Sequence, residues 1–194
     1  MNTIILEEIE NGELIPIDVY TKLSGSRILF LTEDIDDKLA SDVVATLFLK
    51  DIEDPGEKIT LFINSEGGDI RNVLMIYDMI NIIQSPVETV CIGSCLDEVS
   101  IILASGAKRL ATKNAIIAIN QLSFEFSTIS DLTEAETILN QKVADNKTMI
   151  NILSKKTGKT VAQITKDFSH QVFFTAESAL KYGLIDGIIS TSKK

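Results

Sequence analysis

The 194-residue sequence is poor in histidine, cysteine and proline, and it has no tryptophan. With one histidine and two cysteines, few side chains are left for a metal centre or for general-base catalysis near neutral pH. Cys91 and Cys95 are too few for a disulfide framework, and they lie only four positions apart. We therefore expect two buried thiols in a reducing compartment, and neither a metal nor a cofactor.

Positive charge is also in the minority, with 18 Lys+Arg against 28 Asp+Glu and a formal net charge of −10. Binding to nucleic-acid phosphates needs clustered Lys and Arg, so nucleic acid is not expected as a partner. The longest uncharged run, residues 114–124, is far shorter than the ~18 apolar residues of a membrane span. The N-terminus lacks the basic start of a secretory signal. These features predict a soluble, cytoplasmic protein with no membrane partner.

Short runs of β-branched and aromatic residues alternate with helical patterns along the chain. Such apolar runs are typical of strands that are buried on both faces of a parallel sheet. The alternation predicts an α/β fold of repeated βαβ units with helices flanking the sheet. The expected strands are 27–31, 59–63, 89–92 and 116–119, and the expected helices between them are 35–50 and 70–83.

The segment after Gln121 departs from this alternation. Apolar and polar residues alternate over 122–128, which predicts a strand. The spacing of Thr133 and Glu136 predicts a capping box and the start of a helix of about six turns that stops at Gly158. A strand and long helix outside the repeating units predict a projection whose apolar side needs another surface. Shorter helices are expected from Thr160 and over 176–182, and no linker divides the chain.

Three expected strands end in segments that suit a binding site, because sites in open α/β sheets form beyond the carboxyl ends of the strands. Residues 64–69 contain the pair Gly67 and Gly68, residues 93–98 follow the third strand, and Asn120 follows the fourth. Adjacent glycines let backbone N–H groups face a ligand, although many such turns need only the conformational freedom of glycine. The sequence thus predicts the place of a site but not its chemistry.

Several of these motifs, taken in order, resemble the proteolytic subunit of the Clp protease, ClpP. They are Ile-Asn-Ser-Glu-Gly-Gly at 63–68, Cys-Ile-Gly at 91–93, Leu-Ala-Ser-Gly-Ala-Lys-Arg at 103–109, Ile-Asn-Gln at 119–121, Phe-Phe-Thr-Ala-Glu at 173–177 and Tyr-Gly-Leu-Ile-Asp at 182–186. The resemblance covers essentially the whole chain. It implies one domain, 1–194, of the ClpP/crotonase-like fold, with an axial N-terminal segment at about 1–17, a head at 18–121 and 158–194, and a projecting handle at about 122–157.

The same resemblance implies that the peptidase chemistry has been lost. The positions of the family's nucleophilic serine, basic histidine and orienting aspartate are here Asp97, Asn120 and Gln171. An acyl-enzyme mechanism needs a nucleophile whose proton a positioned base can accept. Asp97 is not a hydroxyl nucleophile, and neither Asn120 nor Gln171 titrates. We therefore expect no catalytic residue in this chain.

The backbone N–H groups that form the oxyanion hole of the family correspond to Gly68 and Glu98. We expect the Asp97 carboxylate to lie near these two donors, in the place of an oxyanion. The competing expectation is that the carboxylates of Glu66, Asp69 and Glu98 repel it into solvent.

The resemblance also implies an assembly. ClpP-like subunits form heptameric rings, two of which stack through the handle around a chamber, and AAA+ unfoldases of the ClpX, ClpA or ClpC type dock on the outer faces. We therefore expect a proteolytically inactive subunit with a structural or regulatory role, in rings of its own or in rings with an active paralogue. Phe62 and Ile82 align with unfoldase-docking positions and remain apolar.

Two other functions remain open at this point. An active serine-type endopeptidase with a rearranged site would use His170 with Ser94 or Ser100, or would use Cys95 as its nucleophile. A crotonase-like enzyme would bind acyl-CoA at the same paired amides, with the neighbouring carboxylates as acid and base.

Overall fold

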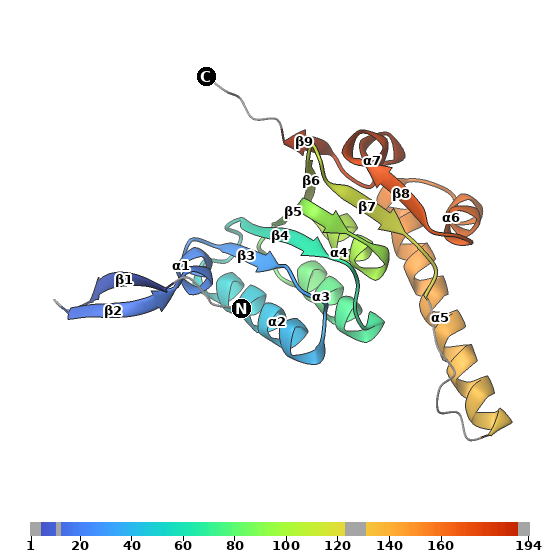
Figure 1. The fold of residues 1–194 in the computed structure, drawn as a ribbon, viewed down its shortest axis with the longest axis horizontal. Helices are drawn as coiled ribbons and strands as arrows, with labels where there is room; N and C mark the ends of the chain where they lie inside the picture. Colours follow the sequence, from blue (N-terminus) through green and yellow to red (C-terminus); the bar gives the residue numbers. More distant parts are fainter. Residues whose placement is uncertain (1–4, 11–12, 123–130, 190–194) are drawn as a thin grey trace.

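The structure is a computed structural model that describes residues 5–10, 13–122 and 131–189 (Figure 1). The described chain begins with an antiparallel hairpin of β1 (Ile5–Glu10) and β2 (Glu13–Asp18), which leads into the short helix α1 (Val19–Gly25). The hairpin extends away from the rest of the molecule (Figure 1). No alternation in the sequence had indicated these two strands.

The main sheet is mostly parallel, which confirms the predicted α/β fold. Five strands pair in parallel in the order β3 (Ile28–Leu31), β4 (Ile59–Ser65), β5 (Val87–Cys95), β6 (Lys108–Thr112) and β9 (Gly187–Ile189). The strand β7 (Ile116–Ile119) pairs in parallel with the end of β5 and antiparallel with β8 (Val172–Thr175).

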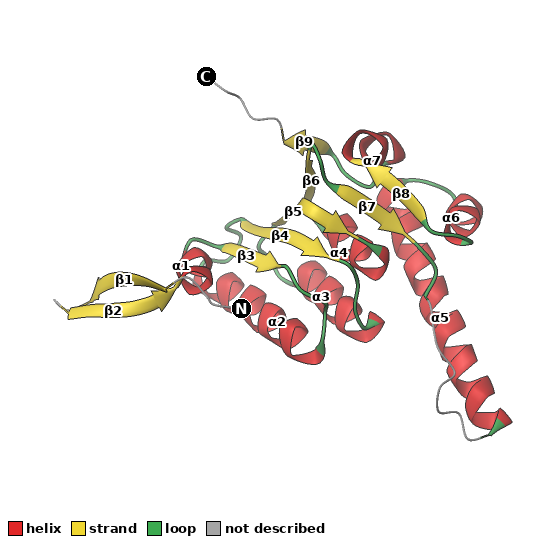
Figure 2. Ribbon diagram, in the orientation of Figure 1, coloured by secondary structure: helices red, strands yellow, loops and turns green. Residues whose placement is uncertain are grey.

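Helices connect these strands and form the second layer of the fold (Figure 2). They are α2 (Asp37–Glu53), α3 (Ile70–Ile82), α4 (Ser100–Ser105), α5 (Leu132–Thr157), α6 (Val161–Phe168) and α7 (Ala176–Tyr182), together with the 3₁₀ turn η1 (Asp97–Val99). The side chains of Asp36 and Asp69 cap α2 and α3, each accepting a hydrogen bond from a backbone N–H of the first turn.

Burial along β3 and β4 corrects the expectation that the strands are covered on both faces. Leu61 and Ile63 are fully buried, whereas the alternate residue Phe62 is only half-buried. The Phe62 ring stacks on the Phe30 ring of β3, with the ring centroids 5.2 Å apart. The helices α2 and α3 lie on one side of these strands (Figure 1), so the aromatic side remains partly open in a single chain.

The helix α5 is 26 residues long and projects beyond the body of the molecule (Figure 1). Its first turn is capped by Asp131, whose side chain accepts a hydrogen bond from the backbone N–H of Glu134 at 2.9 Å. The predicted capping box at Thr133 is therefore wrong, because Thr133 already lies inside the helix. The helix ends, as predicted, at Gly158 with φ of +73°. The predicted strand over 122–128 lies almost entirely outside the described residues.

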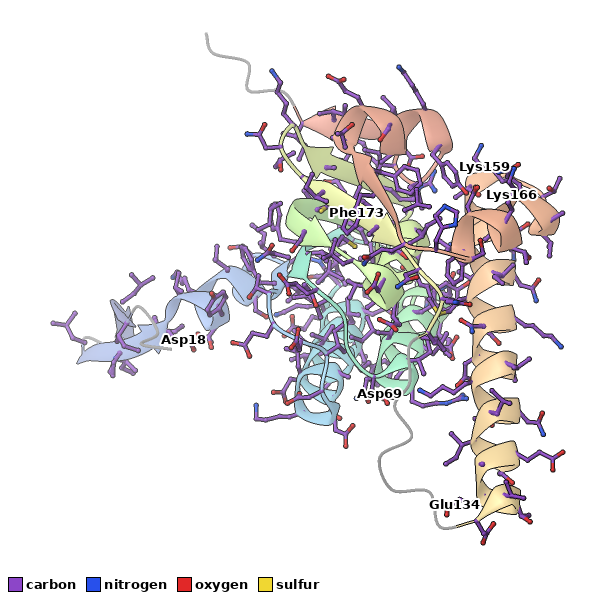
Figure 3. All side chains as sticks on the ribbon, turned by 45° about the vertical axis from the view of Figure 1, so that its right-hand side comes forward. Asp18, Asp69, Glu134, Lys159, Lys166 and Phe173 are labelled. Carbon is purple, nitrogen blue, oxygen red and sulfur yellow. The ribbon has the colours of Figure 1, made fainter. Side chains whose placement is uncertain are left out.

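Glu134 marks the free tip of α5, and Lys159 marks the opposite end beside the head (Figure 3). Midway along the helix, the buried carboxylate of Asp145 accepts hydrogen bonds from Arg71 of α3 and from Gln141. Nearer the tip, Leu139 and Val143 are 43% and 42% exposed. The inner half of α5 is thus attached to the head, whereas two apolar side chains of its outer half stay uncovered.

The core includes Cys91 and Cys95, which are both buried and not joined in a disulfide, as predicted. Within the described ranges, no helix has the length and apolarity that a membrane span requires.

Candidate functional site

The candidate site is built at the carboxyl ends of β4 and β5. The loop after β4 is held by a parallel bridge between Gly68 and Ile35, in which Ile35 donates to the Gly67 carbonyl at 3.0 Å. A Cβ atom on Gly68 would lie only 2.6 Å from the Ile35 carbonyl oxygen, so glycine is required for this close approach. The loop that carries Gly67 and Gly68 is therefore fixed against the segment before α2.

After β5 the chain makes a sharp turn into η1, and Asp97 lies at the apex of this turn. Its φ of +51° falls in the left-handed region that residues other than glycine adopt rarely. The Ser100 hydroxyl donates to the Asp97 carbonyl oxygen at 2.6 Å, and the Leu96 N–H donates to the Ser65 carbonyl oxygen at 3.1 Å. A strand-to-helix turn of this kind exposes the side chain at its apex.

Gln171 contacts Asp97 directly, since its side-chain nitrogen donates to the Asp97 carboxylate at 3.0 Å. Asn120 and Gln171 lie just beyond the same end of the β7–β8 pair, because Ile119 pairs with Val172. No hydrogen bond joins the Asn120 side chain to another described residue. The structure therefore brings Asp97 and Gln171 into contact but does not place Asn120 as a link between them.

The other candidate residues do not form a nucleophile–base pair. His170 is exposed, and its Nδ1 lies 3.1 Å from the hydroxyl of the adjacent Ser169. Ser94 donates to Asn64 at 3.2 Å, and Ser100 uses its hydroxyl on the backbone. Cys95 is fully buried, and this burial raises the pKa of its thiol well above the usual range, which disfavours a thiolate.

Gly68 and Glu98 are the positions expected to form an oxyanion hole, but the Asp97 carboxylate does not lie as expected. Within the described part of the chain, neither the Gly68 N–H nor the Glu98 N–H donates a hydrogen bond to it. Its partner is Gln171, which the sequence had not indicated. The competing expectation, repulsion into solvent, is not met either, because Asp97 is half-buried and hydrogen-bonded.

The carboxylate that does face this loop belongs to Glu98. A Cβ atom on Gly67 would lie 3.4 Å from Glu98 Oε2. Burial raises the pKa of Glu98, its own backbone N–H acts to lower it, and the charge of Asp97 raises it further. Lys142 of α5 is near enough to lower it. The sequence indicated the Glu98 carboxylate as a charge that repels Asp97 or as an acid or base of a crotonase-like site, but not as the group that faces the glycine loop.

The two expected docking residues lie on different elements. Phe62 is half-buried on the open side of β4, and Ile82 is 73% exposed near the end of α3. Ile82 lines an apolar groove of about 430 Å³ together with Val44 of α2 and Met75 and Met79 of α3. Across the described ranges, no cluster of three or more His, Cys, Asp or Glu residues is arranged to hold a metal ion.

A comparison with protein families decides the relationship. The Clp protease family model matches residues 10–192, a range that includes every position of this site. The chain belongs to the Clp protease family. A relative within it, the ATP-dependent Clp protease proteolytic subunit 1 of Cutibacterium acnes, is 34% identical over 177 residues, which cover 90% of this chain and 82% of the relative. Family membership confirms the resemblance seen in the motifs and supports a Clp protease-type subunit.

Proposed function

We propose that this chain is a proteolytically inactive Clp protease subunit with a structural or regulatory role in an ATP-dependent Clp complex. The observation that carries the proposal is the direct hydrogen bond from Gln171 to Asp97, between the positions that align with the family's acid and nucleophile. The Gln171 amide is neither a nucleophile nor a base that could accept the proton of a nucleophile, and Asp97 is not a hydroxyl nucleophile. Asn120, at the position of the base, cannot accept the proton of a hydroxyl.

The proposed assembly is a heptameric ring, formed with copies of itself or with an active paralogue. Large apolar side chains are exposed on α2: Phe48, Leu49 and Ile52 are 51%, 50% and 60% exposed. An exposed apolar patch on a soluble protein marks a contact surface. The α2 surface therefore favours a subunit that is covered by a neighbour.

The remaining parts of the chain fit the same assignment. In it, the β1–β2 hairpin is the axial segment at about 1–17, residues 18–121 and 158–194 form the head, and 122–157 form the handle that stacks two rings. Two separate contacts are proposed for an AAA+ unfoldase: the groove beside Ile82, and Phe62 on the open side of β4. We place the complex in the cytoplasm, in keeping with two unpaired, buried cysteines.

The two alternative functions gain no specific support. A rearranged peptidase site needs a base beside Ser94, Ser100 or Cys95, and His170 contacts Ser169 instead. A crotonase-like enzyme needs an open pair of amides for a thioester oxygen, whereas the Glu98 carboxylate lies against Gly67.

The deciding experiment combines native mass spectrometry with a peptidase assay. The chain is measured alone and after co-expression with the active paralogue, and we expect rings without peptide hydrolysis alone and mixed rings on co-expression. The single variant Asp97→Ser is expected to stay inactive, since base and acid are still missing. Peptide hydrolysis by the unmodified chain would contradict the proposed inactivity, and only separate species after co-expression would contradict the mixed ring.

A further inference from the structure

We propose that the Glu98 side chain blocks the oxyanion hole, so that the site is closed by a built-in carboxylate in addition to the loss of the triad. The inference rests on the proposed function and deepens it, because it assigns a second, independent cause of inactivity. The block lies in the cradle, which we define as the loop of Gly67 and Gly68 together with the backbone N–H of Glu98.

The cradle itself is held in place by hydrogen bonds. Ser65 donates its hydroxyl to the Gly67 carbonyl at 3.2 Å, and the Ile35 N–H donates to the same carbonyl at 3.0 Å. On the other side, the Asp69 N–H donates to the Ile35 carbonyl at 3.1 Å. Among the described residues, the Gly68 N–H between these bonds donates no hydrogen bond. A fixed loop with an uncommitted N–H is what an oxyanion hole requires.

The Glu98 carboxylate lies beside this loop. Its Oε2 is 3.4 Å from the place that a Cβ atom on Gly67 would take, which is an ordinary van der Waals distance. The carboxylate also lies near its own backbone N–H, which is the second donor of the cradle. One side chain thus approaches both halves of the cradle, and it belongs to the residue that follows Asp97.

The chemistry of the block is both steric and electrostatic. A peptide carbonyl that enters the cradle needs the volume held by the carboxylate. The negative charge that develops on its oxygen during acyl transfer would also face a second negative charge. Asp97 and Asp69 contribute further negative charge around Glu98, and Lys142 of α5 is the cation that opposes them. Restoring the serine, histidine and aspartate of the triad would therefore leave this block in place.

The test rebuilds the triad in two backgrounds. The variant Asp97→Ser/Asn120→His/Gln171→Asp is prepared with Glu98 retained and with Glu98→Ala, and labelling of the introduced serine by a fluorophosphonate probe is timed. We expect at least about 100-fold faster labelling with Glu98→Ala, the scale on which oxyanion-hole interactions act. Glu98→Gln keeps the volume of the side chain and removes its charge. A labelling rate between those of the Glu98 and Glu98→Ala backgrounds would show that volume and charge each contribute to the block.

The matched control is Glu66→Gln in the same rebuilt variant. It removes an exposed carboxylate of the same loop without opening the cradle, so the labelling rate should change less than about threefold. Equal labelling with and without Glu98, or no labelling in either background, would overturn the inference. Melting temperature and ring mass are measured for each variant.

If the rebuilt proteins fail to fold, the position of the Glu98 side chain in the unmodified protein still tests the inference. In a crystal structure of the unmodified protein in its assembled form, the Glu98 carboxylate should lie beside Gly67 and near its own backbone N–H, as it does here. A side chain directed into the solvent would overturn the inference. The proposed function is tested separately, because its failure would show as peptide hydrolysis or lack of co-assembly by the unmodified chain.

Discussion

Asp97 retains a left-handed backbone although its side chain cannot act as the nucleophile of an acyl transfer. Such a conformation costs a residue with a Cβ atom about 1 kcal/mol or more, so the surrounding contacts must hold it. These contacts are the Ser100 hydroxyl on the Asp97 carbonyl and Gln171 on the carboxylate. The turn therefore persists as a structural feature, independent of catalysis.

The close approach at Gly68 leads to a prediction about stability. Gly68→Ala places a Cβ atom 2.6 Å from the Ile35 carbonyl oxygen at a φ of +155°, so we expect a loss of about 1–3 kcal/mol in the free energy of unfolding. Gly25→Ala is the matched control, because nothing lies within 4 Å of its added Cβ atom. Urea titration of both variants checks the prediction, and equal stability of the two would contradict it.

The carboxylate of Asp186 gives a pH-dependent prediction. It accepts hydrogen bonds from the backbone and side chain of Arg109, and these bonds hold the pKa of Asp186 below its usual value of 3.8. A carboxyl with a lowered pKa in the folded state stabilises the fold above its unfolded pKa, and this stability is lost as the pH falls through the folded pKa.

Asp186→Asn should therefore cost about 1 kcal/mol at pH 7, because solvent screens the 42% exposed Asp186 side chain although the Arg109 side chain is only 13% exposed. The difference from the unmodified protein should shrink below about pH 4. Asp42→Asn, which removes the exposed pair with Lys38, should change stability by less than about 0.5 kcal/mol. Denaturation over a pH series measures both, and a difference that stayed constant with pH would refute the mechanism.

The site residues show how far the sequence could predict chemistry. Asp97, Asn120 and Gln171 could be predicted as the replaced triad positions because motif order and spacing run along the chain. The Gln171–Asp97 bond and the position of Glu98 depend on side-chain rotamers and on how two loops meet. Neither has a periodic signal in the sequence, and residues 97 and 171 are joined only by the fold.

At the scale of elements, α5 begins at the Asp131 cap and ends at Gly158, and its first turn gives a third prediction. Asp131→Ala removes the side chain that accepts the Glu134 N–H, which should cost the helix end about 1 kcal/mol and speed amide exchange in the first turn roughly fivefold. Thr133→Ala should leave exchange nearly unchanged, because Thr133 is not the cap. Hydrogen exchange by mass spectrometry compares the two, and the reverse order would restore the capping box that the sequence predicted.

Elements with a continuous apolar run or a helical period were predicted well, and strands without such a signal were not. The helices expected at 70–83 and 176–182 and the strands at 59–63 and 116–119 agree with α3, α7, β4 and β7 to within a few residues. The strands β6, β8 and β9 were missed, since three to five residues of mixed polarity show no period. Their conformation is set by neighbours in the sheet.

The whole molecule carries apolar surface that one chain cannot cover, and this gives the fourth prediction. Leu139→Glu/Val143→Glu places charge on the exposed side of the outer half of α5, so we expect stacked rings to separate into single rings that stay intact. Native mass spectrometry reads the ring number directly. Thr137→Glu/Thr148→Glu adds the same charge to exposed positions around the other side of the helix and should leave stacking unchanged. Stacked rings in the first variant would show that α5 does not join them.

The attachment of α5 at its midpoint makes its outer half a lever arm. The part beyond the Asp145–Arg71 contact, residues 132–144, is about 20 Å long at the usual rise of an α-helix. A tilt of 10° about that contact moves the tip by roughly 3 Å, which is enough to break van der Waals contact with a facing surface. In the proposed assembly, the buried Asp145 carboxylate of α5 thereby sets the distance at which a second ring can be held.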